Sequence, residues 1–250
     1  MKKIFQGKEM ELGVSKLASM LKEANKTVIL TGAGMDTESN IPDFRSKNGW
    51  WRQIDPRLVA STNSLYNDYS TFHEFYLLRI KLLEGIMPHR GHYVLADLEK
   101  AGLLESIITQ NVAGLHTLAG NKNVYELHGN IRSIRCDKCG EGAKIEDFFA
   151  GKDCRACGQR ALRPNVVLFG EALPPKVWEA ALADIESCDL LLVIGTSLEV
   201  YPVNQLPLWT RGKTVLINNE DRGAGYSFDL KIIGRAGEVL GNLSKALASL

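Results

Sequence analysis

Four short apolar runs constrain the fold of this chain more than any other feature. They are rich in Val, Ile and Leu without apolar–polar alternation, and they cover residues 27–31, 106–109, 190–194 and 214–217. Strands that helices cover on both faces show this pattern. Segments with the apolar spacing of amphipathic helices also occur, around residues 17–24, 178–185 and 240–250. The alternation predicts an α/β fold with a doubly wound, Rossmann-like parallel sheet.

Small or amide-bearing residues follow each of the four runs. In chain order they are Gly32-Ala33-Gly34, Gln110-Asn111, Gly195-Thr196-Ser197 and Asn218. Ligands of open α/β sheets bind at the carboxyl ends of the strands, so we expect a binding site where these residues meet. The glycine turn would let a pyrophosphate approach the backbone. The third glycine of G-x-G-x-x-G is replaced by Thr37, so this motif alone fits a turn without a ligand equally well.

Two segments interrupt the alternation of strands and helices. Residues 42–90 are helical and aromatic in character, and residues 131–162 contain four of the five cysteines. We predict that a helical module and a zinc-ribbon module from these segments form a smaller, inserted lobe. The Rossmann-like domain would then consist of residues 1–41, 91–130 and 163–250.

The cysteines form two CxxC pairs, Cys136/Cys139 and Cys154/Cys157. Pairs at this spacing can place four thiolates around one Zn²⁺, and a site filled by four protein ligands is structural, not catalytic. Four free thiols or two disulfides are the alternatives, which a reducing compartment disfavours. Cys188 is interpreted as a small core residue.

Charge and hydropathy exclude several classes of protein. Thirty Lys and Arg residues stand against 29 Asp and Glu, a net charge of +1. This balance argues against a broad contact surface for nucleic acid, including one on the zinc module, or for an anionic membrane. No apolar run approaches the roughly 18 residues of a membrane span, and the charged N-terminus lacks the apolar region of a secretory signal. A cytoplasmic location is predicted.

Two further positions are ambiguous from the residues alone. His128 precedes Gly129 after a short apolar stretch, but a lone histidine is more often structural than catalytic. Tyr76 and Arg79 lie three residues apart on a predicted helix and so share a face. A packed tyrosine beside a surface arginine would give the same pattern.

Taken together, these motifs resemble the sirtuin family of NAD-dependent protein lysine deacylases. The resemblance covers nearly the whole chain in the family's order, and the compact chain is similar to prokaryotic members. The matching segments are 32–34 with 41–45, 110–116, 127–129, the two CxxC pairs, 163–171, 195–198 and position 218.

The resemblance implies a reaction that transfers an acyl group from lysine to the ADP-ribose part of NAD and releases nicotinamide. In that reaction the acyl oxygen attacks C1′ of the nicotinamide ribose. His128 would then take a proton from a ribose hydroxyl as general base, and Asn111 would order the ribose and a water. A neutral imidazole with a pKa near ambient pH suits this step.

The resemblance also implies contact residues. The NAD contacts would be Gly32, Ala33, Gly34, Asp43, Phe44, Arg45, Gln110, Asn111, Gly195, Thr196, Ser197, Asn218 and Ala236. Val167 and Phe169 would line a tunnel for acyl-lysine, with the substrate peptide added as a strand between the lobes. Tyr76 and Arg79 resemble a pair that receives acidic acyl groups, which makes succinyl- or malonyl-lysine an alternative to acetyl-lysine.

Three residues depart from the family's pattern. Asn40 replaces a glycine, which is tolerable because Asn adopts left-handed φ more readily than most residues. Asp36 replaces a serine, and an ionised carboxylate ~4 Å from a phosphate would repel it by about 4 kcal/mol at an effective dielectric of about 20. It would avoid this by capping the next helix. Ala113 replaces an aspartate on the nicotinamide side, which would remove an anchor of the carboxamide. Asp36 and Ala113 together predict impaired activity.

These departures keep two other functions open. One is a catalytically weak protein that binds NAD or ADP-ribose. The other is an NAD glycohydrolase or ADP-ribosyltransferase. Nothing in the sequence indicates an oligomeric state.

Overall fold

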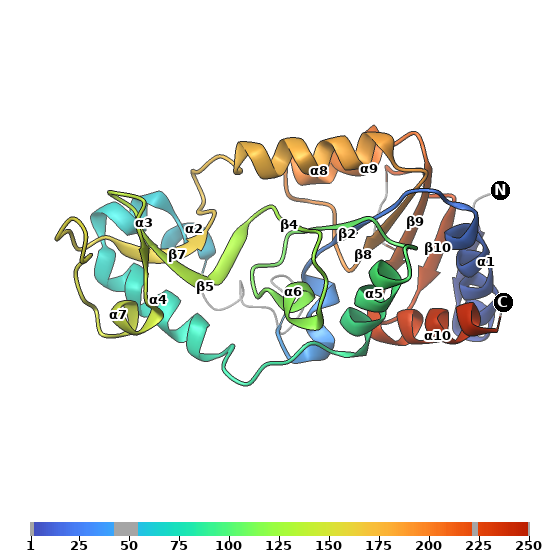
Figure 1. Ribbon diagram of the computed structural model, residues 1–250, viewed down its shortest axis with the longest axis horizontal. Helices are drawn as coiled ribbons and strands as arrows, with labels where there is room; N and C mark the ends of the chain where they lie inside the picture. Colours follow the sequence, from blue (N-terminus) through green and yellow to red (C-terminus); the bar gives the residue numbers. More distant parts are fainter. Residues whose placement is uncertain (1–2, 43–54, 222–224, 250) are drawn as a thin grey trace.

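A computed structural model describes residues 3–42, 55–221 and 225–249. The larger of its two lobes is built on a seven-stranded sheet with the order β1-β10-β9-β8-β2-β3-β4 (Figure 1). All neighbouring strands of this sheet are parallel. The strands are β1 Lys3–Gln6, β2 Thr27–Thr31, β3 Ser106–Thr109, β4 Val124–Glu126, β8 Leu190–Ile194, β9 Lys213–Asn218 and β10 Leu230–Ile233.

The four predicted strands are confirmed as β2, β3, β8 and β9, and the doubly wound fold class is confirmed with them. Three strands were not predicted. β1 and β4 are the edge strands of the sheet, where little apolar surface is buried, and β4 is only half-buried along its length. β10 has Lys231 within four residues, which breaks the apolar run.

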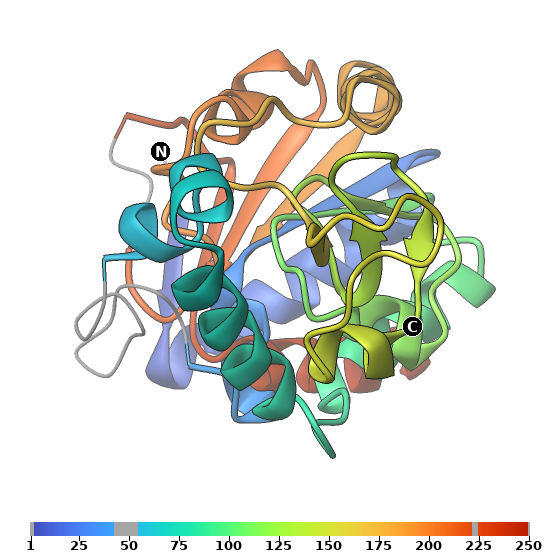
Figure 2. The ribbon, with the colours of Figure 1, turned by 90° about the vertical axis from the view of Figure 1, so that its left-hand side faces the viewer.

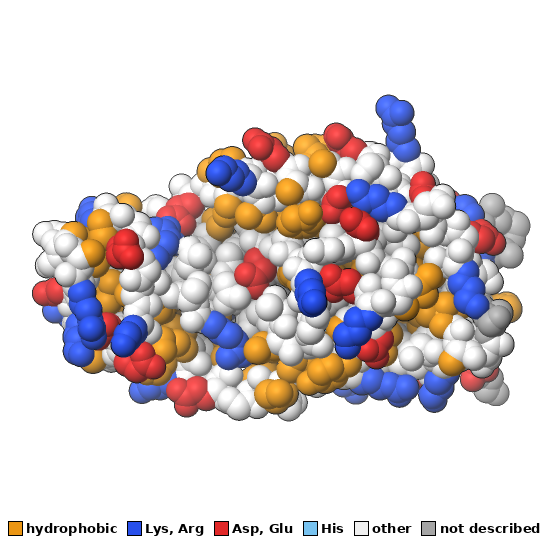
Figure 3. All heavy atoms as spheres, in the orientation of Figure 1, with side chains coloured by type: hydrophobic (Ala, Val, Ile, Leu, Met, Phe, Trp, Pro, Cys, Tyr) orange, Lys and Arg blue, Asp and Glu red, His pale blue; other side chains and the backbone are white. Residues whose placement is uncertain are grey.

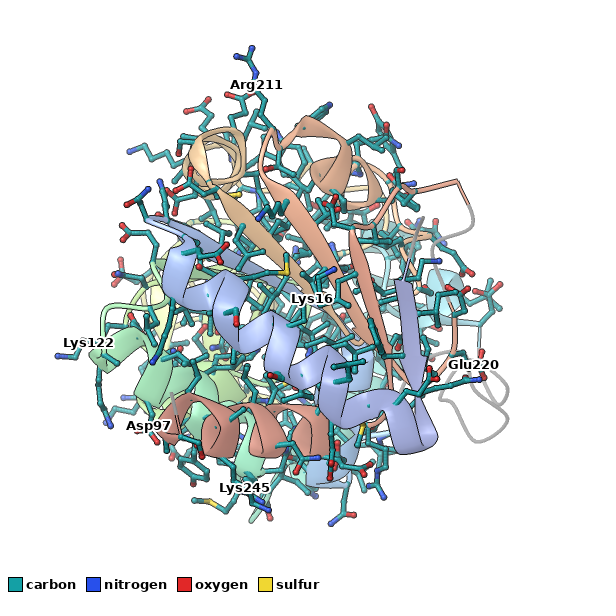
Figure 4. The ribbon with its side chains drawn as sticks, turned by 90° about the vertical axis from the view of Figure 1, so that its right-hand side faces the viewer. Lys16, Asp97, Lys122, Arg211, Glu220 and Lys245 are labelled. Atoms are coloured by element: carbon teal, nitrogen blue, oxygen red, sulfur yellow. The ribbon has the colours of Figure 1, made fainter. Side chains whose placement is uncertain are left out.

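Helices cover both faces of this sheet. α1 (Met10–Glu23), α5 (Arg90–Lys100) and α10 (Ala236–Ala248) pack on one face, and α8 (Pro175–Ser187) and α9 (Leu206–Trp209) pack on the other. Figure 4 shows α1 and α10 side by side over the sheet. Alternate strand residues face the two layers, as Ile29 and Val28 do, so the strands carry apolar side chains throughout.

The smaller lobe has its own sheet and core. Its antiparallel strands, in the order β6-β5-β7, are β6 Gly142–Ala143, β5 Gly129–Cys136 and β7 Leu162–Val166. Figure 2 views this lobe from its free end, with α4 in front. Its helices are α2 Pro56–Val59, α3 Thr62–Asn67, α4 Tyr69–Lys81 and α7 Ile145–Phe149. One apolar cluster contains residues of both predicted modules, for example Phe72 and Phe148, whereas the predicted domain boundaries stay a prediction.

Short elements complete the connections. They are α6 Leu115–Ala119 and the 3-10 turns η1 Gly7–Glu9, η2 Ala33–Met35, η3 Thr37–Ser39 and η5 Val203–Gln205. Within the described ranges, no helix is both long and apolar enough to cross a membrane.

Candidate active site and metal centre

The carboxyl ends of β2, β3, β8 and β9 meet at one edge of the large sheet. Thr31, the last residue of β2, pairs in register with the last residues of both β3 and β8, Thr109 and Ile194. Ile194 in turn pairs with Ile217 of β9. This register brings together the four groups of small and amide residues that follow these strands.

Two glycine turns pack directly against each other at this edge. The Gly34 amide donates a hydrogen bond to the Gly195 carbonyl at 2.7 Å. A Cβ atom on Gly34 would lie 2.8 Å from the Gly195 Cα, and one on Gly32 would lie 2.6 Å from the Thr196 Cβ. Glycine is therefore needed here for the approach of two backbones, which also leaves the turn open to a ligand.

Amide side chains fix the relative positions of these turns. Asn111, which is 8% exposed, donates from Nδ2 to the Gly32 carbonyl at 3.0 Å. Gln110 donates from Nε2 to Thr196 Oγ1 at 3.0 Å. Asn218 donates from Nδ2 to the Thr196 carbonyl at 3.4 Å. The predicted cofactor residues at the ends of four strands, β2, β3, β8 and β9, are thus joined into one hydrogen-bonded set.

The remaining predicted cofactor residues lie near this set or fall outside the described residues. Ala236 is buried at the first position of α10, and Ser197 is half-buried beside Thr196. Ala33 lies within the glycine turn, as the first residue of η2. Asp43, Phe44 and Arg45 lie outside the described residues.

His128 is held in one tautomer between β4 and β5. Its Nδ1 lies 3.0 Å from the Gln110 carbonyl, which can only accept, so Nδ1 carries the proton. The neutral ring then has its lone pair on Nε2. Burial lowers the pKa of His128 below 6.5, although the bond to Gln110 acts in the opposite direction. A neutral imidazole with a free Nε2 is equipped to accept a proton.

The segment proposed for substrate contact, which continues from β7 beyond Val166, is hydrogen-bonded to His128. The Val167 amide donates to the His128 carbonyl at 2.9 Å. Val167 also lines a cavity of about 890 Å³ between the lobes, which β4, β5 and the start of α8 complete. Figure 3 shows the surface hollowed beneath α8. Phe169 does not line this cavity and is 44% exposed.

A buried arginine that the sequence analysis did not single out holds this strand in place. Arg163 is 0% exposed, and its guanidinium donates to both carboxylate oxygens of Glu171, at 2.5 and 2.9 Å. It also bonds Asp137 at 3.0 Å and the Val166 carbonyl at 2.6 Å. Glu171 accepts from the Leu168 amide at 2.7 Å. This clamp fixes the backbone on either side of Val167, and no local sequence pattern indicates it.

The four predicted metal ligands converge. Their sulfur atoms all lie within 4.8 Å of one another. The Cys136–Cys157 and Cys139–Cys154 sulfur distances are 3.6 and 3.7 Å. Tetrahedral Zn²⁺ with Zn–S bonds of about 2.3 Å needs sulfur separations of about 3.8 Å, so the residues fit one zinc ion.

The two knuckles of this metal centre have the same backbone. Gly140 and Gly158 follow the second cysteine of each pair, with φ of +76° and +71°. Each donates its amide proton to the carbonyl of the first cysteine of its pair, at 3.0 and 2.8 Å. Each glycine thus closes a tight turn around its cysteine pair, and all five cysteines of the chain are free of disulfides.

Comparison with known proteins identifies the family of this chain. The model of the Sir2 family matches residues 32–202, more than half of the chain. The chain belongs to the Sir2 family. It is 43% identical over 229 residues to the "NAD-dependent protein deacetylase" of Oceanobacillus iheyensis, which covers 90% of this chain and 97% of the relative. It is 44% identical over 243 residues to the "NAD-dependent protein deacetylase 1" of Geobacillus kaustophilus, with 94% and 98% covered.

Solved structures of the Sir2 family share this fold. A Sir2 structure described with a deacetylated p53 peptide and 3′-O-acetyl ADP ribose matches with a TM-score of 0.87 at 34% identity. The match covers 93% of this chain and 97% of that chain.

This Sir2 chain pairs Asp36 in its interior. The expected repulsion of phosphates presumed a carboxylate without a partner. Instead Asp36 is 4% exposed, and its Oδ1 lies 3.1 Å from Nε2 of the fully buried His92. The alternative of a helix cap is not observed, because its side chain makes no cap hydrogen bond to η3. Asn40 does adopt the left-handed conformation, with φ of +62°.

In this Sir2 chain Tyr76 and Arg79 share one face of α4, as predicted. The Arg79 guanidinium carbon lies 6.0 Å from the centre of the Tyr76 ring and 5.6 Å from that of Phe75. Burial raises the pKa of Tyr76 to about 12, so its phenol is neutral, and burial lowers the pKa of Arg79. A role of this pair in acyl binding stays a prediction.

Proposed function

We propose that this protein is an NAD-dependent protein lysine deacylase that contains one structural zinc ion. The observation that carries the proposal is the placement of His128. Its tautomer is set by the Gln110 carbonyl, its own carbonyl is bonded to Val167, and Gln110 is bonded to Thr196 beside the glycine turns. A proton acceptor thus stands between a nucleotide-binding edge and a strand that lines the cavity between the lobes.

Some residues of the proposed site bind NAD, and others orient the ribose or accept a proton. The backbone of Gly32-Ala33-Gly34 and the residues Gly195, Thr196, Ser197, Asn218 and Ala236 bind NAD, and Asp43, Phe44 and Arg45 are further contacts in this proposal. NAD supplies the ribose carbon that accepts the acyl oxygen, with nicotinamide as the leaving group. Asn111 orients the ribose, and Nε2 of neutral His128 takes the proton of a ribose hydroxyl.

The substrate is an acyl-lysine side chain of a protein or peptide between the two lobes. Val167 and Phe169 contact it, and the peptide adds as a strand beside the segment that Arg163 clamps. Tyr76 and Arg79 would favour an acidic acyl group, because an arginine can bind a carboxylate through two hydrogen bonds. A balanced net charge and unpaired cysteines support a cytoplasmic protein without nucleic-acid or membrane partners.

Mass spectrometry of NAD, nicotinamide and peptide tests the proposal. The protein is incubated with matched acetyl-lysine and succinyl-lysine peptides, with a reaction without peptide in the same series. We expect O-acyl-ADP-ribose from at least one peptide and its loss in His128→Ala. Nicotinamide release without peptide would instead indicate a glycohydrolase or ADP-ribosyltransferase. NAD binding without turnover would indicate a binding protein.

A variant of Arg79 tests which residues determine the preference for the acyl group. If Tyr76 and Arg79 receive acidic groups, Arg79→Met lowers the rate on succinyl-lysine and leaves acetyl-lysine within a factor of about three. Equal losses on both peptides would contradict that role.

A further inference from the structure

A buried polar cluster lies directly behind the glycine turn. Asp36 is 4% exposed, His92 0% and His116 2%. The ring centre of His92 is 4.4 Å from that of His89 and 4.9 Å from that of His116. None of these histidines was singled out by the sequence analysis, and they come from the start of α5 and from α6.

Two histidines at the start of α5 tie down the end of the glycine turn. His89 accepts the Gly91 amide proton on Nδ1, so its Nε2 carries the ring proton and donates to the Met35 carbonyl at 2.7 Å. The next residue, Asp36, is held through its side chain by His92 at 3.1 Å. Adjacent residues of the turn are thus anchored to one rigid helix, one through its backbone and one through its carboxylate.

The same cluster continues to Asn111. Nε2 of His116 lies 3.0 Å from Thr31 Oγ1, and that hydroxyl donates to Thr109 Oγ1 at 2.8 Å. The backbone amide of Asn111 donates to Thr109 Oγ1 at 3.0 Å. The side-chain Nδ2 of Asn111 donates to the Gly32 carbonyl, which connects this network to the glycine turn. The His92 and His116 rings, tilted at 56° to each other, therefore lie between Asp36 and the residues that orient the bound ribose.

The hydrogen bond between Asp36 and His92 has one polarity. An ionised carboxylate only accepts, so Nε2 of His92 carries the proton and donates it. A buried donor or acceptor that loses its partner costs the full desolvation of the group, more so when a charge is involved. With His92 in place, the carboxylate is buried and satisfied inside the protein.

We propose that Asp36 and His92 act together as positioning residues of the NAD site, holding the glycine turn at the distance from Asn111 that NAD binding requires. This inference rests on the proposed function. It gives the Asp36 carboxylate a constructive role in NAD binding, in place of the phosphate repulsion expected from the sequence.

A double-mutant cycle tests the pair. The variants are Asp36→Ala, His92→Ala and the double variant, with the KM for NAD, the KM for the acyl-lysine peptide and the Kd for ADP-ribose measured for each. Because each single variant leaves a buried partner unsatisfied, we expect each to raise the KM for NAD and the Kd for ADP-ribose about tenfold. The double variant should be no weaker than either single variant, and the KM for peptide should stay within about twofold.

Conservative variants separate positioning from general damage to the fold. Asp36→Asn keeps an acceptor for His92 and should retain the KM for NAD within about threefold, whereas Asp36→Ser is too short and should behave like Asp36→Ala. Asp97→Asn is the matched control, because Asp97 is an exposed carboxylate on the same helix as His92, at the surface in Figure 4. Combining Asp36→Ser with Ala113→Asp, which restores the family's residues, should lower activity below that of the natural chain.

The outcomes are distinguishable. Single variants within twofold of the natural chain in both the KM for NAD and the Kd for ADP-ribose would overturn the inference alone. So would losses that multiply in the double variant, or a gain of activity in Asp36→Ser/Ala113→Asp. If the natural chain binds neither NAD nor ADP-ribose, the proposed function fails as well.

Discussion

The two lobes of this protein reach their order by different physical means. The large lobe is held by apolar burial, since β2 and β8 are buried at every residue and are covered on both faces. The small lobe has a strand of only two residues, β6, and its largest fully buried side chain is a charged one, Arg163. Its sheet is supported by a four-cysteine cluster and a clamp of ionic hydrogen bonds.

This difference indicates which part of the proposed site should respond to removal of metal or to a change of pH. Apolar burial is independent of metal, so the strands of the large lobe should keep their packing when zinc is removed. In the small lobe, by contrast, the strands β5 and β7 depend on cysteines that must be deprotonated to bind metal and on the charged pair of Arg163 and Glu171. Three predictions follow the contrast from the largest effect to the smallest.

Removal of the metal should separate the lobes most clearly. Structural zinc contributes on the order of 10 kcal/mol to the folding of small zinc domains. We expect Cys154→Ser, or treatment with a strong chelator, to increase hydrogen exchange in β5 and β7 and abolish deacylation. Exchange in β2 and β8 should stay slow. Cys188→Ser is the control, because Cys188 is buried among residues of the large lobe and belongs to no metal cluster.

Loss of the buried arginine should have the next largest effect. Arg163→Gln leaves Glu171 without its hydrogen-bonded charged partner, and Asp137 keeps Arg135 as a charged partner at 3.8 Å. Breaking a buried pair typically costs about 3–5 kcal/mol. Urea unfolding should report this loss, and the KM for peptide should rise because the backbone beside Val167 is released. Arg155→Gln is matched to it: Arg155 also pairs with a carboxylate, but its side chain is 67% exposed, so its loss should cost much less than the loss of Arg163. Equal costs for the two variants would contradict the assignment of the clamp.

Acid should reveal a smaller contrast, with the large lobe responding first. Burial lowers the pKa of His116 well below 6.5 and also lowers that of His89. As pH falls through 6.5, the unfolded chain binds protons that the folded chain does not, so stability falls by at most about 1.4 kcal/mol per pH unit for each histidine.

The small-lobe clamp responds in a lower pH range. Burial raises the pKa of Glu171, but the bonds from Arg163 and the Leu168 amide outweigh it and lower the pKa below 4.5. Its contribution is present above pH 4.5 and is lost as the pH falls through the lowered value. The melting temperature between pH 7.5 and 5.5 should therefore fall less steeply in His116→Gln than in the natural chain. Parallel curves would show that His116 does not carry the effect.

Much of the nucleotide edge could be predicted from the sequence, because its signals are local. A fully apolar run followed by Gly, Asn or Gln identifies both a buried strand and the residues at its carboxyl end. The CxxC pairs are equally local, and the glycines that follow them have the positive φ that tight turns require. β1, β4 and β10 escaped because edge strands and strands with a lysine lack the apolar run.

The rest of the site depends on contacts that no spacing encodes. Asp36 and His92 are 56 residues apart, and Arg163 reaches Asp137 across 26. For this reason Asp36 was assigned only its charge from the sequence, from which repulsion was expected, while the fold supplied the partner, His92, that satisfies the carboxylate. The sequence specifies the intrinsic charge and size of a side chain, but its role in the protein depends on its burial and on the groups next to it in the fold.

By itself, the sequence determined the parallel sheet, the cysteine cluster and the sheet edge at which the small and amide residues gather, since local patterns of hydrophobicity and thiol spacing are sufficient for these. Only the tertiary structure decided the tautomer of His128, the pairing of Asp36 and the Arg163 clamp. The physical reason is that hydrogen bonds between buried polar groups form only after apolar packing has brought distant segments together.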